Sequence, residues 1–397
     1  MTGTRASRRN WSEMGAQPFE VIIPQETLDD LRERLARTRW PDEVAGAGWD
    51  YGSNLVYVKE LTDYWQHGFD WRAQEAKINR FAHFRVEVDG VGIHFIHERG
   101  RGPEPIPIIL THGWPDSFYR MLRITPLLVD PARHGGNPAD SFDVIVPSLP
   151  GYGFSDRLTE RGMTPSRIAH LWARLMTQEL GYERFAAQGG DIGSGVTQQL
   201  ALDHPDSLVG IHLTDVPYLN LVTFYGDASE LSEAERKYLE EGRKWGQEEG
   251  GYAVVQSTKP QTLAYGLNDS PAGLAAWILE KFRSWSDSDG DVEKRFSKDE
   301  LLANLTIYWA TETINSSFRV YYEPFHNPPP ANAGERVEVP TGFAMFPKDL
   351  VPAPREWAER FFNVEHWTQM PRGGHFAAME EPELLAEDIR AFFRRFR

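Results

Sequence analysis

The sequence predicts an α/β fold built around a mostly parallel sheet, and three observations lead to this prediction. Short apolar segments of strand type alternate with helical segments between about residues 84 and 215. The alternation gives way to helices alone over about 216–336 and returns over 337–397. A helical, aromatic block precedes it at 1–83. We therefore expect a core in two parts, 84–215 and 337–397, a helical cap inserted at 216–336, and an N-terminal wrapping segment at 1–83.

The N-terminal segment starts with a helix signal and continues with aromatic residues. Thr27 is suited to cap a helix whose apolar residues Leu28, Leu31 and Leu35 share one face, and Pro41 ends it. The aromatic residues of the segment are Trp40, Trp49, Tyr51, Tyr57, Tyr64, Trp65 and Trp71. A segment this short cannot bury these rings alone. We expect it to cover the cap of its own chain or to touch a second copy in a homodimer.

The two parts of the core and the cap divide into recognisable elements. Asp89-Gly90 is a hairpin signal between two strand-like segments. The expected strands are Arg85–Val88, Ile93–Glu98, Ile106–Thr111, Asp143–Val146, Arg184–Gln188, Leu208–Leu213, Gly342–Phe346 and Val364–Gln369. The expected helices are Pro165–Leu180, Ser194–His204, Ser232–Trp245, Pro271–Trp285, Lys298–Thr313, Pro354–Phe361 and Glu383–Phe393, with a proline-rich loop at Asn327–Pro330.

The turn Gly189-Gly190-Asp191-Ile192-Gly193 is the most informative stretch of the chain. It joins a short strand to a helix, which is the setting of a nucleophile elbow, G-x-S-x-G, with Asp in the place of Ser. A carboxylate titrates near ~3.9 and is ionised at pH 7, so it attacks without a base to deprotonate it. Asp191 is therefore the expected nucleophile, and it suits an electrophilic sp³ carbon.

A carboxylate nucleophile leaves an ester that water must hydrolyse, and that water needs a general base. In α/β-hydrolases the chain order is nucleophile, acid, histidine. His375 follows the last expected strand and Asp349 follows the strand before it, so both belong at the sheet edge of Asp191. We expect His375 to be the base and Asp349 its partner, although an Asp that caps a helix before Pro354 is the ordinary alternative for Asp349.

The loop Thr111-His112-Gly113-Trp114-Pro115 follows the strand that starts the core. Loops at this place supply one backbone N–H of an oxyanion hole, and the residue after the nucleophile supplies the other. The expected donors are the amides of Trp114 and Ile192.

Composition excludes several other functions. The net charge of −16 disfavours nucleic acid and anionic lipid as partners. The chain has no cysteine, and no stretch approaches the ~20 apolar residues that span a bilayer, so we expect a soluble, cytoplasmic protein without a membrane anchor. His94 and His97 are expected to point to opposite faces of a strand, so they do not suit a shared metal ion. The acidic turn from Asp287 to Asp291 lacks the ligand spacing of a calcium-binding loop. No metal or organic cofactor is expected.

Taken together, these motifs resemble the microsomal-type epoxide hydrolases, and the likeness covers nearly the whole chain. The matching segments are Trp49-Asp50-Tyr51-Gly52, Tyr64-Trp65, Asp70-Trp71-Arg72, Phe95-Ile96-His97, His112-Gly113-Trp114-Pro115, Pro150-Gly151-Tyr152-Gly153-Phe154-Ser155, Gly189 to Gly193, Thr258-Lys259-Pro260 and Leu267-Asn268-Asp269-Ser270-Pro271. The resemblance implies an α/β-hydrolase core with a helical cap, and hydrolysis of a small lipophilic epoxide to a diol. It further implies a catalytic triad. The compact form without cysteine suggests a bacterial enzyme, for which we expect a role in detoxification or secondary metabolism.

The resemblance also implies two cap tyrosines that donate hydrogen bonds to the epoxide oxygen, and local context places them at Tyr252 and Tyr321. Tyr322 is the alternative to Tyr321, because the register is open by one residue. Asp116 stands where the family pattern leads us to expect Gly. Its carboxylate is expected either to bias the pocket mouth toward polar or cationic substrates or to face solvent.

Two other functions remain open on the sequence. A dehalogenase shares an Asp nucleophile on this fold, but its haloalkane type often has Trp directly after the nucleophile, where this chain has Ile192. A non-catalytic ligand-binding protein of this fold is the alternative outside enzymes. Release of halide, or binding without diol formation, separates these functions from epoxide hydrolysis.

Overall fold

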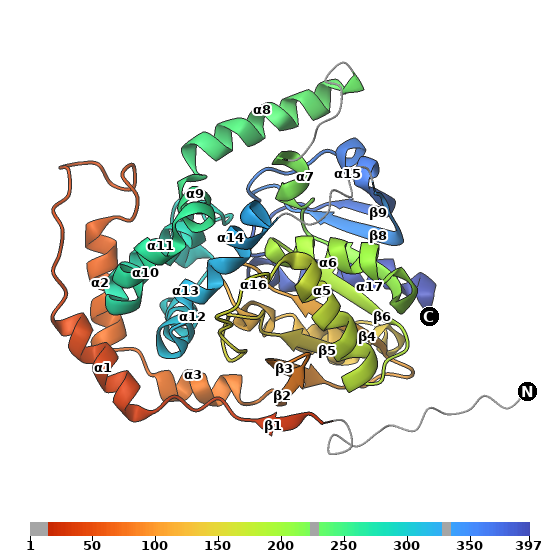
Figure 1. Ribbon diagram of the computed structural model, residues 1–397, viewed down its shortest axis with the longest axis horizontal. Coiled ribbons are helices and arrows are strands. Elements are labelled where there is room, and N and C mark those ends of the chain that lie inside the picture. Colours follow the sequence, from red (N-terminus) through yellow and green to blue (C-terminus); the bar gives the residue numbers. More distant parts are fainter. Residues whose placement is uncertain (1–14, 223–229, 328–334) are drawn as a thin grey trace, which may run out of the picture.

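The computed structural model describes residues 15–222, 230–327 and 335–397 of the chain. Its centre is a sheet of strand order β1-β2-β3-β5-β4-β6-β7-β8-β9 (Figure 1). The first strands pair antiparallel, and from β5 to β9 all neighbours are parallel. The strands are β1 Gln17–Phe19, β2 His83–Val88, β3 Val91–Glu98, β4 Ile106–Thr111, β5 Phe142–Pro147, β6 Phe185–Gly189, β7 Leu208–Leu213, β8 Val337–Met345 and β9 Phe362–Gln369. The predicted α/β fold with a mostly parallel sheet is confirmed.

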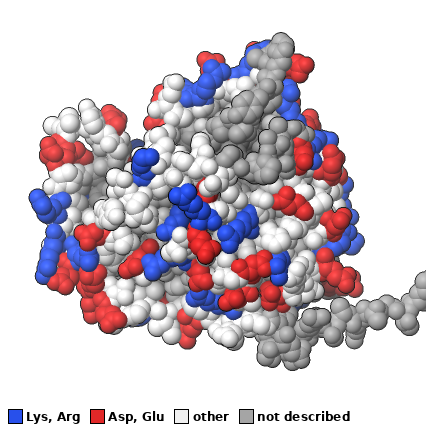
Figure 2. Space-filling view, viewed as in Figure 1, with Lys and Arg blue, Asp and Glu red and all other residues white. Residues whose placement is uncertain are grey.

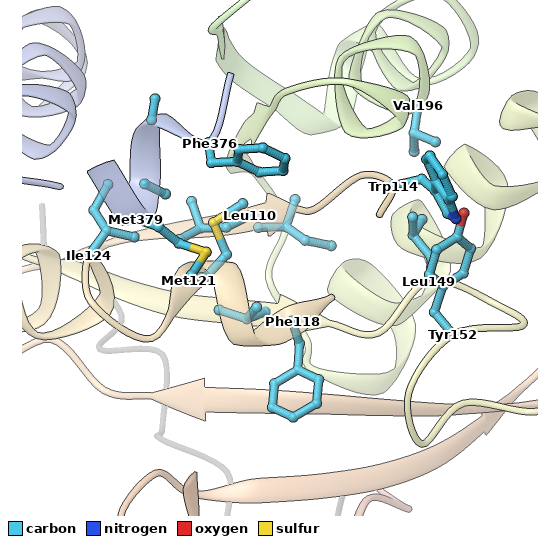
Figure 3. Packing of buried hydrophobic residues seen from close by; sticks show 14 of the residues in the cluster. Leu110, Trp114, Phe118, Met121, Ile124, Leu149, Tyr152, Val196, Phe376 and Met379 are labelled. Carbon is cyan, nitrogen blue, oxygen red and sulfur yellow. The ribbon is translucent and has the colours of Figure 1, made fainter. Parts of the chain in front are cut away.

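Helices cover both faces of this sheet. On one face α5 and α6 pack against each other, and on the other α17 packs on β7 and β8 beside α4. The helices of the core are α4 Thr125–Val129, α5 Pro165–Arg174, α6 Ile192–Asp203, α7 Tyr218–Val222, α15 Arg355–Phe361, α16 Ala377–Glu380 and α17 Pro382–Phe393. The strands buried between these layers are almost wholly apolar, as the parallel arrangement requires. Figure 3 shows part of this core, with Leu110, Met121, Phe376 and Met379 packed together.

Local predictions for the core hold with small corrections. The Asp89-Gly90 turn does close a hairpin, and both residues have positive φ, 49° and 76°. Thr27 was predicted to cap the first helix, and this is wrong. The helix α1 Gln25–Ala36 begins two residues earlier, after Pro24, so Thr27 lies inside its first turn. The prediction relied on a side-chain cap, but the helix starts after Pro24, whose φ of −55° suits a helix start, and no side chain caps it.

A helical insertion stands between β7 and β8, over the carboxyl edge of the parallel strands (Figure 1). Its helices are α8 Glu233–Glu248, α9 Gly251–Thr258, α10 Pro260–Asp269, α11 Pro271–Ser284, α12 Lys298–Thr311, α13 Ile314–Ser317 and α14 Arg319–His326. Three of these were predicted, and α8 starts at a complete capping box between Ser232 and Glu235. The predicted loop after Asn327 lies outside the described residues.

The N-terminal segment lies on its own chain. Its helices α1, α2 Leu55–His67 and α3 Trp71–Ile78 run along the insertion and then along β1 and β2 (Figure 1). The Trp65 indole donates to Thr306 at 3.0 Å, and the Tyr64 hydroxyl donates to Asp299 at 2.9 Å. Of the two expected uses of its aromatic residues, the structure therefore shows cover for the cap, and a homodimer stays a prediction.

The surface carries both signs of charge. Figure 2 shows Lys and Arg interspersed with Asp and Glu over core and insertion on the visible face, so the excess of acid is not gathered there into one patch. Among the described residues, no helix combines the length and apolar character needed to cross a membrane.

Candidate active site

Asp191 occupies a tight turn between β6 and α6. Its φ is 59° and its ψ is −126°, a backbone conformation that L-residues seldom adopt. The turn is possible because glycines surround it. A Cβ on Gly193 would lie 2.2 Å from the carbonyl oxygen of Thr111, and one on Gly113 would lie 2.3 Å from Oδ1 of Asp191. The predicted elbow is therefore present, with the carboxylate lifted above the edge of the sheet.

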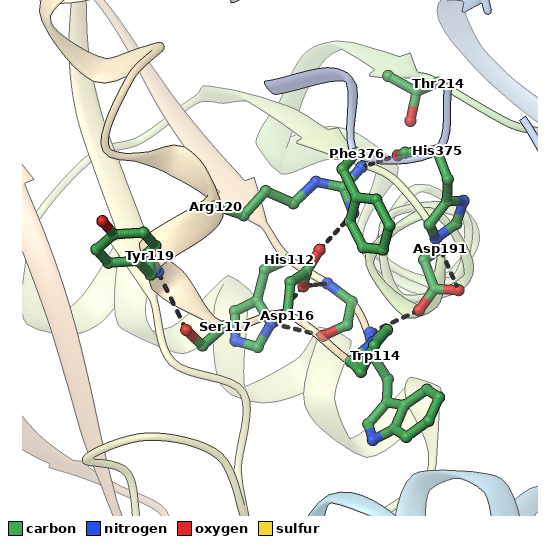
Figure 4. Close-up of polar contacts among 12 residues, drawn as sticks. His112, Trp114, Asp116, Ser117, Tyr119, Arg120, Asp191, Thr214, His375 and Phe376 are labelled. Atoms are coloured by element: carbon green, nitrogen blue, oxygen red, sulfur yellow. Dashed lines mark hydrogen bonds and ion pairs between the residues drawn. The ribbon is translucent and has the colours of Figure 1, made fainter. Parts of the chain in front are cut away.

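The Asp191 carboxylate is bound from the loop that follows β4. The Trp114 amide donates to Asp191 Oδ1 at 2.8 Å, and the ring of Trp114 points away from the carboxylate (Figure 4). The structure thus brings the Trp114 amide to Asp191, and its use as an oxyanion donor stays a prediction. Ile192 is the first residue of α6, directly after Asp191. Its amide as the other oxyanion donor stays a prediction.

His375 and Asp349 meet Asp191 from the ends of neighbouring strands. His375 Nδ1 lies 2.7 Å from Asp349 Oδ1, and Nε2 lies 3.5 Å from Asp191 Oδ2. Asp349 follows β8 and His375 follows β9, so both stand at the sheet edge of the elbow. The imidazole is therefore held by one carboxylate on one side and faces the other carboxylate with its second nitrogen.

The charges around His375 decide its protonation. Burial alone would lower the pKa of the imidazole, but Asp349 and Asp191 outweigh it through charge and hydrogen bonding and raise the pKa to about 10. His375 is thus an imidazolium at neutral pH. Loss of either carboxylate charge would lower that pKa.

Tyr252 and Tyr321 lie over the site from α9 and α14 of the insertion. The Tyr252 ring stacks on Trp114, with centroids 5.2 Å apart and planes 6° apart. Tyr321 stands edge-on to both rings at 6.0 Å from each, and its hydroxyl is buried. Tyr322, the alternative in the sequence, stacks on His326 at 3.8 Å instead. The geometry therefore favours Tyr321 over Tyr322.

Both phenols are neutral acids in this setting. Burial, followed by the charge of Asp191, raises the pKa of Tyr252 well above its usual value. Burial also raises the pKa of Tyr321, and the charges of Tyr252 and Asp191 add to it. Trp285 closes the aromatic wall, 5.1 Å from the Tyr252 ring and 5.3 Å from the His375 ring. Both phenols are therefore protonated at neutral pH, and they lie among aromatic rings within electrostatic reach of Asp191.

Asp116 does neither of the two things expected of it. Its side chain is 1% exposed, so it reaches neither a pocket mouth nor solvent. It accepts the Gly113 amide at 2.9 Å and pairs with Arg120 Nη1 at 2.7 Å. Burial would raise the pKa of Asp116, but Arg120 and His112 outweigh it and lower the pKa to about 2. The expectation was wrong because the sequence does not show that Arg120, four residues on, lies in the same buried space.

Three polar residues near the site were not predicted, of which Arg120 and Glu380 are buried and Asp215 is partly buried. Besides Arg120, Asp215 accepts the Asp191 amide at 2.9 Å and the Ser194 hydroxyl at 2.7 Å. Glu380 accepts the amides on both sides of His375, from Gly374 at 3.1 Å and Phe376 at 2.9 Å. Only Asp215 could have been found from the sequence. It follows the strand β7 as Asp349 follows β8, which places both at the same edge of the sheet. Burial, then the charge of Asp349, raises the pKa of Asp215 to about 7.

The histidines and the acidic turn that the sequence raised as metal ligands have other partners. His94 bonds to His83 at 2.9 Å and to Ser148 at 2.8 Å. Asp287 pairs with Arg295 and accepts the Gly373 amide, both at 2.9 Å. Within the described ranges, no group of three or more His, Asp or Glu residues is arranged to hold a metal ion.

The chain is similar to known proteins over most of its length. Residues 16–121 match the family described as epoxide hydrolase N terminus, and 106–252 match the alpha/beta hydrolase fold. A Stigmatella aurantiaca protein named "Putative epoxide hydrolase" is 44% identical, over 96% of this chain and 86% of its own length. Epoxide hydrolase 1 of Sus scrofa is 40% identical, over 95% and 88%. The crystal structure of juvenile hormone epoxide hydrolase from Bombyx mori superposes with a TM-score of 0.82 and 30% identity, over 97% of this chain and 94% of that one.

Proposed function

Because the chain belongs to the epoxide hydrolase family, we propose that it opens an epoxide to a vicinal diol through an ester on Asp191. One observation carries this mechanism. A single carboxylate accepts the Trp114 amide at 2.8 Å through Oδ1 and faces the His375 imidazole at 3.5 Å through Oδ2. The nucleophile is thus within reach of the base that would later act on its ester.

In the first half of the reaction, Asp191 attacks a carbon of the three-membered ring and the carbon–oxygen bond breaks. Tyr252 and Tyr321 donate hydrogen bonds to the oxygen, and one of them gives up its proton as the negative charge develops. Their raised pKa values keep both hydroxyls protonated until that moment. The product is a neutral ester between Asp191 and the new alcohol.

The ester itself changes the role of His375. Alkylation removes the charge of Asp191, which is one of the two charges that raise the pKa of the imidazole. The pKa therefore falls, and the imidazolium proton restores the phenol. The neutral imidazole, held through Nδ1 by Asp349, is now a general base for water.

In the second half, water attacks the carbonyl carbon of the ester while His375 takes its proton. The amides of Trp114 and Ile192 stabilise the resulting oxyanion, an effect of ~2.7–4 kcal/mol per donor. Collapse of this intermediate expels the alkoxide, which takes the remaining water proton from the Asp191 carboxyl group. The diol, the Asp191 carboxylate and the His375 imidazolium result. The aromatic wall of Trp114, Tyr252 and Trp285 favours a lipophilic substrate.

Isotope labelling tests the ester directly. In a single turnover in ¹⁸O-water, label should enter the Asp191 carboxylate, because water attacks the carbonyl carbon there. The measurement is mass spectrometry of the peptide that contains Asp191. Solvent oxygen found only in the diol of that first turnover would mean direct attack of water on the epoxide. The His375→Gln variant should accumulate the ester as an added substrate mass, and undiminished turnover would remove His375 from its role.

A substrate panel separates this function from dehalogenation. The paired phenols suit an alkoxide oxygen, and Ile192 occupies the position where the haloalkane type often has Trp. Diol from styrene-oxide-type epoxides without halide release from haloalkanes is the expected result.

A further inference from the structure

Arg120 lies where three loops of the active site meet. Its Nη1 pairs with Asp116 at 2.7 Å, in the loop that carries the Trp114 amide. Its Nη2 donates to the carbonyl oxygen of His375 at 2.6 Å. The same nitrogen would be 3.2 Å from a Cβ placed on Gly190, directly before the nucleophile. Figure 4 shows the guanidinium reaching from Asp116 to the His375 backbone.

The geometry excludes contact between Arg120 and substrate. Its side chain is 2% exposed, and the guanidinium lies 5.8 Å from the centre of the Phe376 ring, on the core side of His375. Asp116 is held in turn by the Gly113 amide at 2.9 Å. The pair thus forms a bridge from the oxyanion loop to the histidine loop, with both charges enclosed by the core.

His375 has three anchors, and Arg120 supplies one of them. Its amide donates to the carbonyl oxygen of Trp285 at 2.9 Å, its Nδ1 lies 2.7 Å from Asp349, and its carbonyl accepts from Arg120. The first anchor comes from the insertion and the second fixes only the ring. The Arg120 contact ties the histidine backbone to the loop that holds the oxyanion site.

We propose that Arg120, held by Asp116, is a positioning residue that sets His375 for attack of water on the Asp191 ester. This inference rests on the proposed function and deepens it. Alkylation needs Asp191 and the two phenols, which Arg120 does not hold through a hydrogen bond. Ester hydrolysis needs the imidazole placed to within less than an ångström of the water, and misplacement of about 1 Å can cost 10²-fold in rate. The loss of Arg120 should therefore slow the second half-reaction more than the first.

The variant Arg120→Lys tests the bridge while it keeps the buried charge. One ammonium can serve Asp116 or the His375 carbonyl, but it lacks the fork that spans both. Rapid-quench mass spectrometry follows formation and decay of the ester in the intact enzyme. We expect formation within about threefold of wild type and decay at least tenfold slower, so that the ester accumulates during turnover.

Arg123→Lys is the matched control. Arg123 also ties this segment to the histidine loop region, through the carbonyl oxygen of Met379 at 2.7 Å, but it does not touch His375. It should leave both rates within about twofold. The double variant Asp116→Asn/Arg120→Gln removes both buried charges together, and its glutamine, two bonds shorter than arginine, cannot span from the side chain at position 116 to the His375 carbonyl. Its ester should therefore also decay at least tenfold more slowly than in wild type, and this variant serves as the test if Arg120→Lys does not fold.

The outcomes separate the two hypotheses. Unchanged ester decay in Arg120→Lys would overturn the positioning role, as would equal slowing of formation and decay. Ester decay in the double variant within about threefold of wild type would also overturn it, because the bridge between Asp116 and the His375 carbonyl would then be dispensable. Absence of any ester in both wild type and His375→Gln would instead refute the proposed function, whatever Arg120 does.

Discussion

At the scale of single residues, Tyr321 and the adjacent Tyr322 should differ in their effect on the rate of ester formation. Tyr321→Phe removes one of two donors to the developing alkoxide, so ester formation should fall about 10²-fold, at the lower end of acid catalysis because Tyr252 remains. Tyr322→Phe is the matched control, since its ring stacks on His326 away from Asp191. Its rate of ester formation should stay within about twofold of wild type. Equal losses in both variants would contradict the assignment of Tyr321.

His375 should give a characteristic pH dependence. Its folded-state pKa of about 10 lies above the usual 6.5, because Asp349 and Asp191 stabilise the imidazolium. The stability it contributes is therefore fully present below pH 6.5 and is lost as pH rises toward 10. In urea unfolding, the advantage of wild type over His375→Gln should shrink across this range. An advantage that grows with pH would contradict the assigned charge state.

The same residue links pH to turnover. The ester form lacks the Asp191 charge, so the imidazole there titrates below its value in the free enzyme. The rate of ester decay should rise with pH through that lower pKa and then level off. Rapid-quench measurements across pH give this profile, and a decay rate that falls with rising pH over the same range would exclude His375 as the base.

Chemistry and chain order were enough to predict Asp191, His375 and Asp349 as neighbours, because strand ends of a parallel sheet meet at one edge. The tyrosines came from the resemblance alone, since nothing in their local sequence distinguishes a donor from a buried ring. Arg120 was beyond prediction. An i, i+4 charge pair is usually a solvated surface pair, and only the three-dimensional structure shows that this one is enclosed.

At the scale of elements, the glycines of α6 provide a matched pair. A Cβ on Gly193 would meet the Thr111 carbonyl oxygen at 2.2 Å, whereas one on Gly195 would meet nothing within 4 Å. Gly193→Ala should displace the elbow and slow ester formation about 10²-fold. Gly195→Ala should keep the rate and stabilise the helix by ~0.5–1 kcal/mol. Rapid-quench kinetics and urea unfolding check both, and a normal rate in Gly193→Ala would contradict the close approach.

Within the insertion, the three longest helices were predictable and the shorter ones were not. The capping box at Ser232 and the prolines at Pro165 and Pro271 mark helix starts that the structure keeps. The four short helices α9, α10, α13 and α14 have too few turns for a periodic pattern. The strand β8 begins at Val337, five residues before the predicted start, because its first residues include Glu338 and Pro340, which are unusual in a strand.

At the scale of the whole molecule, the N-terminal segment joins the insertion to the core. Trp65 is 2% exposed and bonds to Thr306 in α12. Trp65→Ala should cost ~3–5 kcal/mol in the free energy of unfolding, by loss of a large buried ring. Tyr51→Ala, in the same segment but 81% exposed, should change it by less than ~0.5 kcal/mol. Urea unfolding compares the two, and equal losses would show that burial at Trp65 is not the cause.

The divisions that the sequence suggested, 1–83, 84–215, 216–336 and 337–397, remain predictions about domains. Contacts between α2 and α11, and between α3 and α12, run across two of them. Such shared burial favours one cooperative unit over separate folding units.

The belt of α1, α2 and α3 also bears on how molecules reach Asp191. The Ser53 hydroxyl donates to Ala276 in α11 at 2.6 Å, and Tyr64 and Trp65 hold α12. Because α11 and α12 are held in this way, they cannot move away from the core as a rigid body unless these hydrogen bonds break. We therefore expect entry to depend on fluctuations of side chains rather than on a hinge, and so to discriminate between substrates by size. Relative rates of hydrolysis across a series of ring-substituted styrene oxides should fall as the width of the substrate increases. Rates that follow only the intrinsic reactivity of the oxirane would contradict selection by size.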